Sequence, residues 1–226
     1  MTYGRDCIRN GLFEEIGLEA ERLGLMRRCT DEERAESQAR MLADVGADED
    51  VWIFGYGSLM WNPAIHYAER LPCLVRGWHR SFCLWTPMGR GTPDNPGLVL
   101  ALDRGGSCRG VTYRVAARDR ETELPLLWQR EMVGDGYKPR WVTVRCDAGE
   151  KRAITWVINR QGARYAGKLP METLARTLAT ASGRLGSGRE YLENTVAHLD
   201  ELGIGERPLH KIRDRVRDYA RMNGEE

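Results

Sequence analysis

The chain has 226 residues, of which 42% are hydrophobic and 30% charged, and its formal net charge at pH 7 is +1. This length suits one domain with an extension or two small domains, and it buries a substantial core. The near-neutral charge excludes a strong attraction to nucleic acid or to an anionic membrane. No apolar run reaches the about 20 residues of a transmembrane helix, and the first residues lack the apolar stretch of a signal peptide. We therefore expect a soluble, cytoplasmic protein without nucleic-acid or membrane partners.

The six cysteines and four histidines show no spacing typical of a metal site. No two cysteines are separated by two residues, and the closest pair, Cys73 and Cys83, is too far apart for one zinc knuckle. The sequence therefore predicts no metal and no other cofactor. The cysteines are expected to be free, mostly buried thiols, as in a reducing cytosol.

Residues 1–49 are predicted to form a helical N-terminal extension. Residues 30–33, Thr-Asp-Glu-Glu, match a capping box that opens a helix. Ala35, Ala39 and Leu42 give this helix a modest apolar stripe, and residues 46–50 end it. The sequence leaves open whether the extension covers the main domain or contacts a partner.

The main domain, residues 50–226, begins with a buried strand at 51–54, an apolar run that ends at a glycine. Further strands are predicted at about 71–76, 80–85, 97–102, 108–115, 140–146 and 152–158. Helices are predicted at about 122–132, 170–183, 188–202 and 209–219. Strands followed by helices favour an α+β fold with a curved sheet or a small barrel.

A candidate binding turn follows the first strand and comprises Phe54, Gly55, Tyr56, Gly57, Ser58 and Leu59. Its two glycines allow a sharp turn and a close approach of a ligand to backbone N–H groups, which can hold a carboxylate or an oxyanion. Met60 stands where dinucleotide-binding and nucleophilic-serine motifs need glycine. A nucleotide site and a nucleophilic Ser58 are therefore not expected. A tight turn without a ligand is the alternative.

Glu131 is the candidate catalytic residue. The preceding apolar positions of its predicted helix are Leu124, Leu127 and Trp128. Residue 131 is the next position of this inward-facing stripe. Burial and the C-terminal end of a helix both raise the pKa of a carboxyl group, which suits a general acid/base. In the alternative, Glu131 turns outward or pairs with Arg130 or Arg140.

Tyr137 and Tyr191 each follow a glycine-rich turn. Both are candidates to offer a hydroxyl group to a polar ligand. The alternative for either residue is a half-buried tyrosine whose hydroxyl reaches water.

Residues 54–63, FGYGSLMWNP, resemble the opening signature of the ChaC-like γ-glutamylcyclotransferases. The similarity continues in order through residues 90–93, 96–97, 130–132, 136–141, 165–167 and 191–196, and it covers about residues 51–217. It departs from the family at Gly89, where many members have histidine, and at Gly188, where many have asparagine. The resemblance implies a small mixed β-barrel with flanking helices and makes residues 50–226 a γ-glutamylcyclotransferase-like catalytic domain.

The resemblance also implies an activity, the cleavage of glutathione to 5-oxoproline and cysteinylglycine. It places the acid/base carboxyl on Glu131 and the substrate-holding turn on residues 54–59; Tyr137 and Tyr191 are weaker candidates for positioning. Other γ-glutamyl amino acids or amines are alternative substrates, and a non-catalytic ligand-binding module on the same fold is a second alternative. The sequence leaves the oligomeric state open and slightly favours a monomer.

Overall fold

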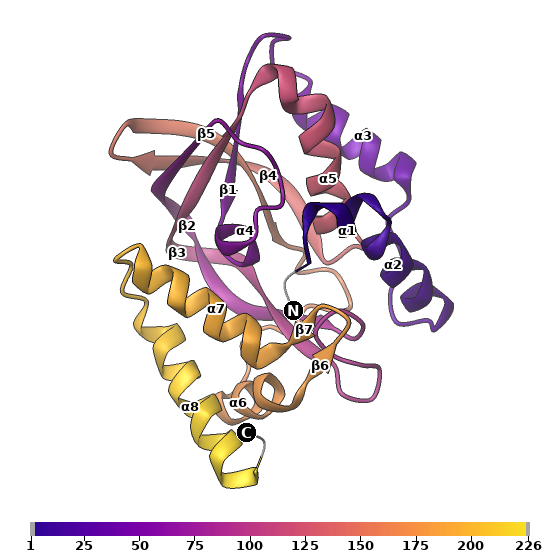
Figure 1. Ribbon diagram of the computed structural model, residues 1–226, viewed down its shortest axis with the longest axis vertical. Coiled ribbons are helices and arrows are strands. Elements are labelled where there is room, and N and C mark those ends of the chain that lie inside the picture. The colour runs from indigo at the N-terminus through magenta and orange to yellow at the C-terminus, as the bar shows by residue number, and fades with distance from the viewer. Residues whose placement is uncertain (1–2, 225–226) are drawn as a thin grey trace.

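Five strands close into a barrel that is flanked by helices on two sides (Figure 1). This computed structural model describes residues 3–224. The strands are β1 (Val51–Gly55), β2 (Glu69–Thr86), β3 (Gly97–Val115), β4 (Tyr137–Cys146) and β5 (Gly149–Ile158). Their order is β1-β3-β2-β4-β5, and β5 closes the barrel by pairing in parallel with β1 and β3. The predicted α+β class and small mixed barrel are confirmed.

Two long strands replace four shorter ones that the sequence predicted. β2 and β3 pair along their whole lengths, from Glu69 opposite Arg114 to Thr86 opposite Gly97. The predicted lengths were wrong, because the polar and glycine-containing stretches 77–79 and 103–107 continue the strands. Gly77 has a φ of +81° beside a register shift in β2, and Gly105 has a φ of +98° within β3. A residue without a Cβ adopts such angles readily, so the strands bend there and continue.

The helices are α1 (Arg5–Arg9), α2 (Leu12–Arg22), α3 (Asp31–Leu42), α4 (Ser58–Trp61), α5 (Arg120–Glu131), α6 (Met171–Thr180), α7 (Gly188–Glu201) and α8 (Arg207–Asn223). The predicted capping box of α3 is present: Thr30 Oγ1 accepts from the Glu33 N–H, and Glu33 Oε2 accepts from the Thr30 N–H. None of the helices within residues 3–224 is long and apolar enough to span a membrane.

Helix α5 packs against one face of the barrel through its predicted apolar stripe. Leu124, Leu127 and Trp128 are almost fully buried there. The ring of Trp128 meets that of Trp156 from β5 edge to face, with centroids 5.1 Å apart. Burying a large apolar side chain contributes about 1.5–3 kcal/mol. This contact therefore fixes the end of α5, where Glu131 lies, relative to the barrel.

Helices α6, α7 and α8 cover the opposite side of the barrel (Figure 1). Leu178, Leu192, Val196 and Val216 are fully buried between these helices and the strands. The helical spacing of the apolar residues in α7 and α8 produces this face. Helix α7 brings Tyr191 towards the end of β1.

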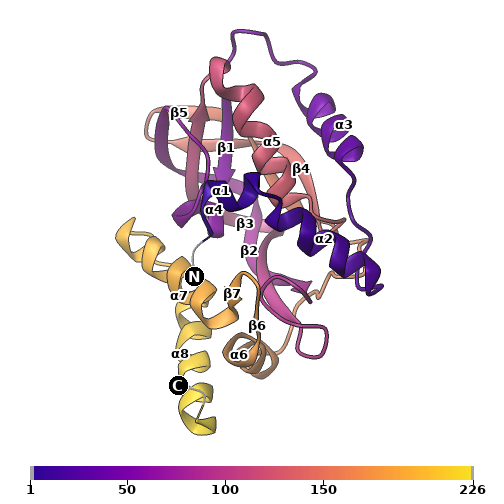
Figure 2. The same cartoon turned by 45° about the vertical axis from the view of Figure 1, so that its right-hand side comes forward.

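The N-terminal segment lies against α5, with α1 and α2 along one side of it in both views (Figures 1 and 2). Ile8 and Phe13 form a buried cluster with Leu126 of α5. Arg5 forms an ion pair with Glu123, whose side chain is 2% exposed. The segment therefore covers part of the main domain; contact with a partner stays a prediction. A domain boundary near residue 50 stays a prediction.

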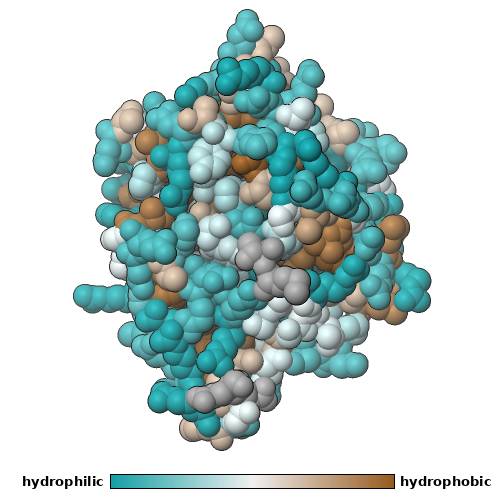
Figure 3. Space-filling view, in the orientation of Figure 1, coloured by the Kyte–Doolittle hydropathy of each residue, from teal (hydrophilic) through white to brown (hydrophobic). Residues whose placement is uncertain are grey.

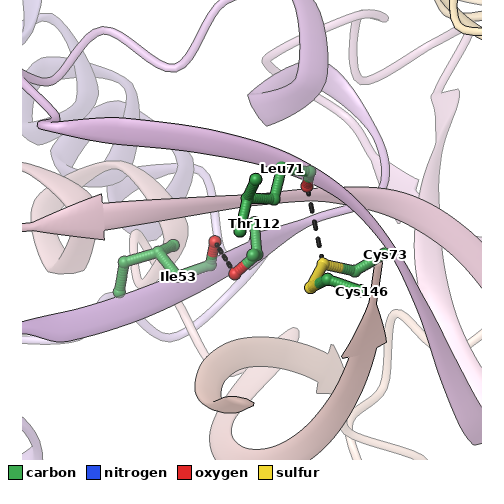
Figure 4. Close-up of a disulfide and its surroundings, with 5 residues drawn as sticks. All are labelled: Ile53, Leu71, Cys73, Thr112 and Cys146. Carbon is green, nitrogen blue, oxygen red and sulfur yellow. Dashed lines mark hydrogen bonds between the residues drawn. A yellow bond between two sulfur atoms is a disulfide. The ribbon is translucent and has the colours of Figure 1, made fainter. Parts of the chain in front are cut away.

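Cys73 and Cys146 form a disulfide (Figure 4), which corrects the expectation of free thiols. The two residues face each other in the antiparallel pairing of β2 with β4, with Cα atoms 4.4 Å apart. Directly opposed residues of an antiparallel pair approach to about 4.5 Å at alternate positions. The pairing of the strands therefore brings together two sulfur atoms that are 73 residues apart in sequence. Cys7, Cys29, Cys83 and Cys108 are free, and all of them except Cys7 are buried.

Candidate active site

Two adjoining cavities lie where α5, α7 and the end of β1 meet. The outer cavity has a volume of about 130 Å³. The inner cavity has a volume of about 20 Å³, enough for about one water-sized group. Four residues that the sequence singled out border both cavities: Ser58, Glu131, Tyr137 and Tyr191. The fold thus assembles most of the predicted site at one place.

Glu131 is the last residue of α5, and its side chain is 13% exposed. Its carboxylate Oε1 lies 3.0 Å from Nε of Arg130. Burial raises the pKa of Glu131 above its ordinary value, and the charge and hydrogen bond of Arg130 oppose this rise. Both interpretations of the sequence therefore hold in part, because Glu131 faces the cavity and also pairs with Arg130. Arg140 instead lies over the ring of Trp78, with its guanidinium 5.9 Å from the ring centroid.

Arg130 organises the groups around Glu131, a role that the sequence analysis missed. Its side chain is 2% exposed. Nη2 donates to Ser58 Oγ at 2.8 Å, and Nη1 donates to the Asn62 carbonyl at 2.5 Å. This guanidinium therefore joins the end of α5 to the turn after β1. No periodicity marks an arginine for such a contact. Its position beside Glu131 was the only available signal.

The predicted binding turn divides between the cavity wall and the core. Residues 56–59 border the inner cavity. Phe54 and Gly55 border neither cavity; Phe54 is fully buried, and its carbonyl accepts a hydrogen bond from Thr155. A Cβ atom on Gly57 would lie 2.7 Å from the Tyr191 hydroxyl. Glycine at position 57 thus allows the turn and this hydroxyl to approach each other.

The tyrosine hydroxyls at the inner cavity are held in buried surroundings. Tyr137 Oη donates to the Leu100 carbonyl at 2.7 Å, and Tyr56 Oη donates to the Trp156 carbonyl at the same distance. Burial raises the pKa of Tyr137 well above its ordinary value and that of Tyr191 to about 12. Both hydroxyls therefore stay protonated at neutral pH. A tyrosine oxygen whose proton is already donated still accepts from a ligand N–H group.

Arg90 is a second arginine that the sequence analysis did not assign to the site. It borders the outer cavity and is 4% exposed. Its guanidinium carbon lies 4.7 Å from the centroid of the Tyr191 ring, and Nη1 donates to the Ser187 carbonyl at 3.0 Å. Burial lowers the pKa of Arg90. The glycines on either side of Arg90 indicated a turn, but they did not show that its side chain is buried.

The N-terminal segment forms part of the outer wall, which no sequence pattern indicated. Tyr3, Phe13, Ile16 and Met26 all border the outer cavity. The Tyr3 ring lies 5.2 Å from the guanidinium carbon of Arg130 and meets the Phe13 ring edge to face. Burial raises the pKa of Tyr3. Figure 3 shows hydrophobic side chains gathered on this face at the level of α1 and α2.

The chemistry available here is that of a buried carboxyl group among fixed donors. Glu131 offers a proton acceptor, Arg90 and Arg130 offer positive charge, and Tyr137 and Tyr191 offer hydroxyl groups. No cysteine borders either cavity. Within residues 3–224, no group of three or more His, Cys, Asp or Glu side chains is placed to hold a metal ion.

Comparisons with known proteins identify the family of this chain. Residues 51–219 match the family model of the ChaC-like proteins. The glutathione-specific γ-glutamylcyclotransferase of Escherichia coli K12 is 41% identical over 182 residues, which cover 80% of this chain and 79% of that protein. The human glutathione-specific γ-glutamylcyclotransferase 1 is 35% identical over 152 residues, which cover 65% of this chain and 68% of the human protein.

A crystal structure of a yeast γ-glutamylcyclotransferase specific to glutathione has the same fold. It superposes with a TM-score of 0.70 and covers 75% of this chain and 96% of that one. The sequence identity is 22%, so this likeness concerns the fold alone. Together with the matched residues 51–219, these comparisons show that the chain belongs to the ChaC-like protein family.

Proposed function

We propose that this chain is a γ-glutamylcyclotransferase that cleaves glutathione to 5-oxoproline and cysteinylglycine, with Glu131 as general acid/base. One observation carries the role of Glu131: its buried carboxyl group, whose pKa is raised, borders both cavities. The names of the E. coli and human relatives support glutathione as the substrate.

The reaction is an intramolecular acyl transfer. The α-amine of the γ-glutamyl group loses a proton to the Glu131 carboxylate and attacks its own γ-carbonyl carbon. A new C–N bond closes the five-membered ring, and Glu131 returns the proton to the cysteinyl nitrogen as the old C–N bond breaks. No water is consumed. Correct folding of the substrate lowers the barrier by about 7–11 kcal/mol, and the proton transfer contributes about 10²–10⁴-fold.

The two cavities suggest how the substrate is oriented. The inner cavity has room for about one small group, so we place an oxygen of the γ-glutamyl group there, against residues 56–59. Backbone N–H groups of this turn then bind the glutamyl carboxylate or the developing oxyanion. The outer cavity holds the cysteinylglycine part. Tyr137 and Tyr191 position the amine, because both residues border the same two cavities as Glu131.

The cellular location and the oligomeric state stay predictions. A cytoplasmic enzyme was expected from the sequence. The disulfide between Cys73 and Cys146 counts against a strongly reducing compartment, because disulfides persist mainly in oxidising environments.

The test is a direct assay of both products with a matched variant. Purified protein is incubated with reduced glutathione, and 5-oxoproline and cysteinylglycine are measured by mass spectrometry. We expect equal amounts of both from the wild type and from Glu121→Gln, an exposed acid on the same helix. Glu131→Gln should lose at least about 10²-fold, the lower limit for acid/base catalysis.

A near-normal rate of the Glu131→Gln variant would refute the role of this carboxyl group. No product from the folded wild type would contradict the reaction with glutathione, and γ-glutamylalanine would then be tested as the alternative substrate. Ligand binding without any turnover would instead favour the non-catalytic module.

A further inference from the structure

Arg164 is a half-buried cation in the wall of the outer cavity, and no protein group among the described residues forms a close ion pair with its guanidinium. Its side chain is 15% exposed, and its Nε atom is buried without a hydrogen-bond partner. Within the described part of the chain, its one ion-pair partner is Asp135, at 3.9 Å from Nη2. That distance is too long for a hydrogen bond. Asp135 is also 38% exposed, so water screens its charge.

Hydrogen bonds to the neighbouring strand β2 hold the backbone around Arg164 in place. The position of its side chain in the cavity wall therefore follows from the fold. The Arg164 carbonyl accepts from the Trp85 N–H at 2.9 Å, and the Ala166 N–H donates to the Cys83 carbonyl at 2.9 Å. Tyr165 donates its hydroxyl proton to Asp103 at 2.8 Å. Residues 164–166 thus run beside β2 and fix the direction of the arginine.

Two glycines make room for the guanidinium group. A Cβ atom on Gly136 would lie 2.7 Å from Arg164 Nη2, and one on Gly134 would lie 3.3 Å from it. The guanidinium therefore lies against the loop that follows Glu131. Burial lowers the pKa of Arg164, as expected for a charge removed from water without a close counter-ion. A cation that borders a cavity, is largely removed from water and lacks a hydrogen-bonded counter-ion suits the binding of an anion.

We propose that Arg164 binds the carboxylate at the C-terminal end of the substrate, so that the site selects γ-glutamyl peptides with a free terminal carboxylate. Arg164 borders only the outer cavity, whereas Glu131 borders both. The arginine therefore lies on the side where the cysteinylglycine part was placed. Its guanidinium group presents two parallel N–H donors, which suit a carboxylate. The assignment rests on the substrate orientation proposed above, whereas its test by binding needs no turnover.

The reach of the substrate agrees with this assignment. Gly134, against which Arg164 lies, is three residues from Glu131, so their Cα atoms are at most about 11 Å apart. An extended dipeptide spans about 7 Å, which is the length from the scissile amide to the terminal carboxylate of glutathione. A γ-glutamylamine has no such carboxylate, and in a γ-glutamyl amino acid it is one residue nearer to Glu131.

The experiment compares glutathione with its glycine ethyl ester, in which a neutral ethyl ester replaces the terminal carboxylate. Equilibrium binding is measured by calorimetry on Glu131→Gln, which keeps both ligands intact, with and without Arg164→Gln. We expect glutathione to bind about 10- to 100-fold more tightly than the ester, in the range of charge-assisted hydrogen bonds. Arg164→Gln should remove this preference by weakening glutathione alone. Arg160→Gln is the control, since Arg160 is 46% exposed and pairs with Asp103.

The outcomes separate the two proposals. Equal weakening of both ligands by Arg164→Gln would overturn the assignment, because Arg164 would then act on the glutamyl end or on the fold. A preference for glutathione that survives Arg164→Gln would also overturn it. Selective binding without turnover by the wild type would support the role of Arg164 and count against the proposed reaction. Turnover of glutathione without any binding preference over the ester would support the proposed reaction and count against the role of Arg164.

A second readout does not depend on a ligand. If the role of Arg164 is to bind a ligand, its weakly paired charge destabilises the ligand-free protein. Arg164→Met should therefore raise the melting temperature of the ligand-free protein. In the Glu131→Gln background, which keeps glutathione intact, the ligand should then stabilise the protein with Arg164 more than the protein with Arg164→Met. A variant that melts at a lower temperature than the wild type would indicate a structural role and would refute the proposal.

Discussion

The contact between Gly57 and Tyr191 permits a sharp test of how closely the site is packed. In Gly57→Ala the new Cβ would lie 2.7 Å from the Tyr191 hydroxyl, whereas ordinary contact begins at 3.4 Å. The hydroxyl must therefore retreat by about 0.7 Å, the difference between these distances. A shift of 1 Å in a reacting group can cost about 10²-fold in rate. We expect kcat/KM to fall by about 10- to 100-fold.

The effect on stability should be smaller. Overpacking of this kind costs about 1–3 kcal/mol, and each kcal/mol lowers the melting temperature by about 2–4 °C in a chain of this size. Rates are measured from 5-oxoproline formation, and folding is checked by thermal melting followed by circular dichroism. Gly205→Ala is the matched control, since its Cβ would meet no atom within 4 Å.

The decisive variant combines Gly57→Ala with Tyr191→Phe. Removing the hydroxyl removes the clash, so the double variant should be as active as Tyr191→Phe alone. If Gly57→Ala keeps full activity, the contact does not position Tyr191. If the double variant is much slower than Tyr191→Phe, the alanine acts on the turn itself, and the reasoning from the hydroxyl fails.

Two further predictions concern charge and the disulfide. In the proposed mechanism Glu131 acts as a carboxylate, so we expect activity to fall as the pH drops through its pKa, which burial raises and Arg130 lowers. Arg130→Met should therefore move the acid limb of the pH profile of kcat/KM to higher pH, whereas Arg140→Met should leave it unchanged. An acid limb at the same pH in Arg130→Met and the wild type would contradict this. Cys73→Ser opens a disulfide between residues 73 apart, which should cost about 4 kcal/mol and about 8–16 °C in melting temperature. An unchanged melting temperature of Cys73→Ser would refute this prediction. So would a reductant that lowers the melting temperatures of the wild type and of Cys73→Ser equally.

The sequence predicted the parts of this molecule that follow from periodicity. The apolar stripe of α5 placed Glu131 inward, and the structure puts its carboxyl group at the junction of the two cavities. The barrel was predicted from its apolar strands, but their lengths were wrong, since Gly77 and Gly105 bend a strand as readily as they end one. The presence of a glycine in a sequence does not show whether a strand bends or ends there.

Contacts between distant segments left no local pattern. Cys73 and Cys146 become neighbours only through the pairing of β2 with β4. Arg90 and Arg164 are charged residues of a type that usually lies in solvent, yet both border the outer cavity. Arginine is usually exposed, and only the fold reveals that these two are not.

The docking of the first residues beside Arg130 has a consequence for how the protein loses activity on heating. The ends of a chain open locally at a lower free energy than the whole domain. Here one such end, from Tyr3 to Met26, supplies a wall of the outer cavity. We expect the N-terminal segment to detach while the barrel is still folded, so that activity disappears below the global melting temperature and returns on cooling. A tag or fusion attached ahead of Tyr3 would lower that first transition without moving the second.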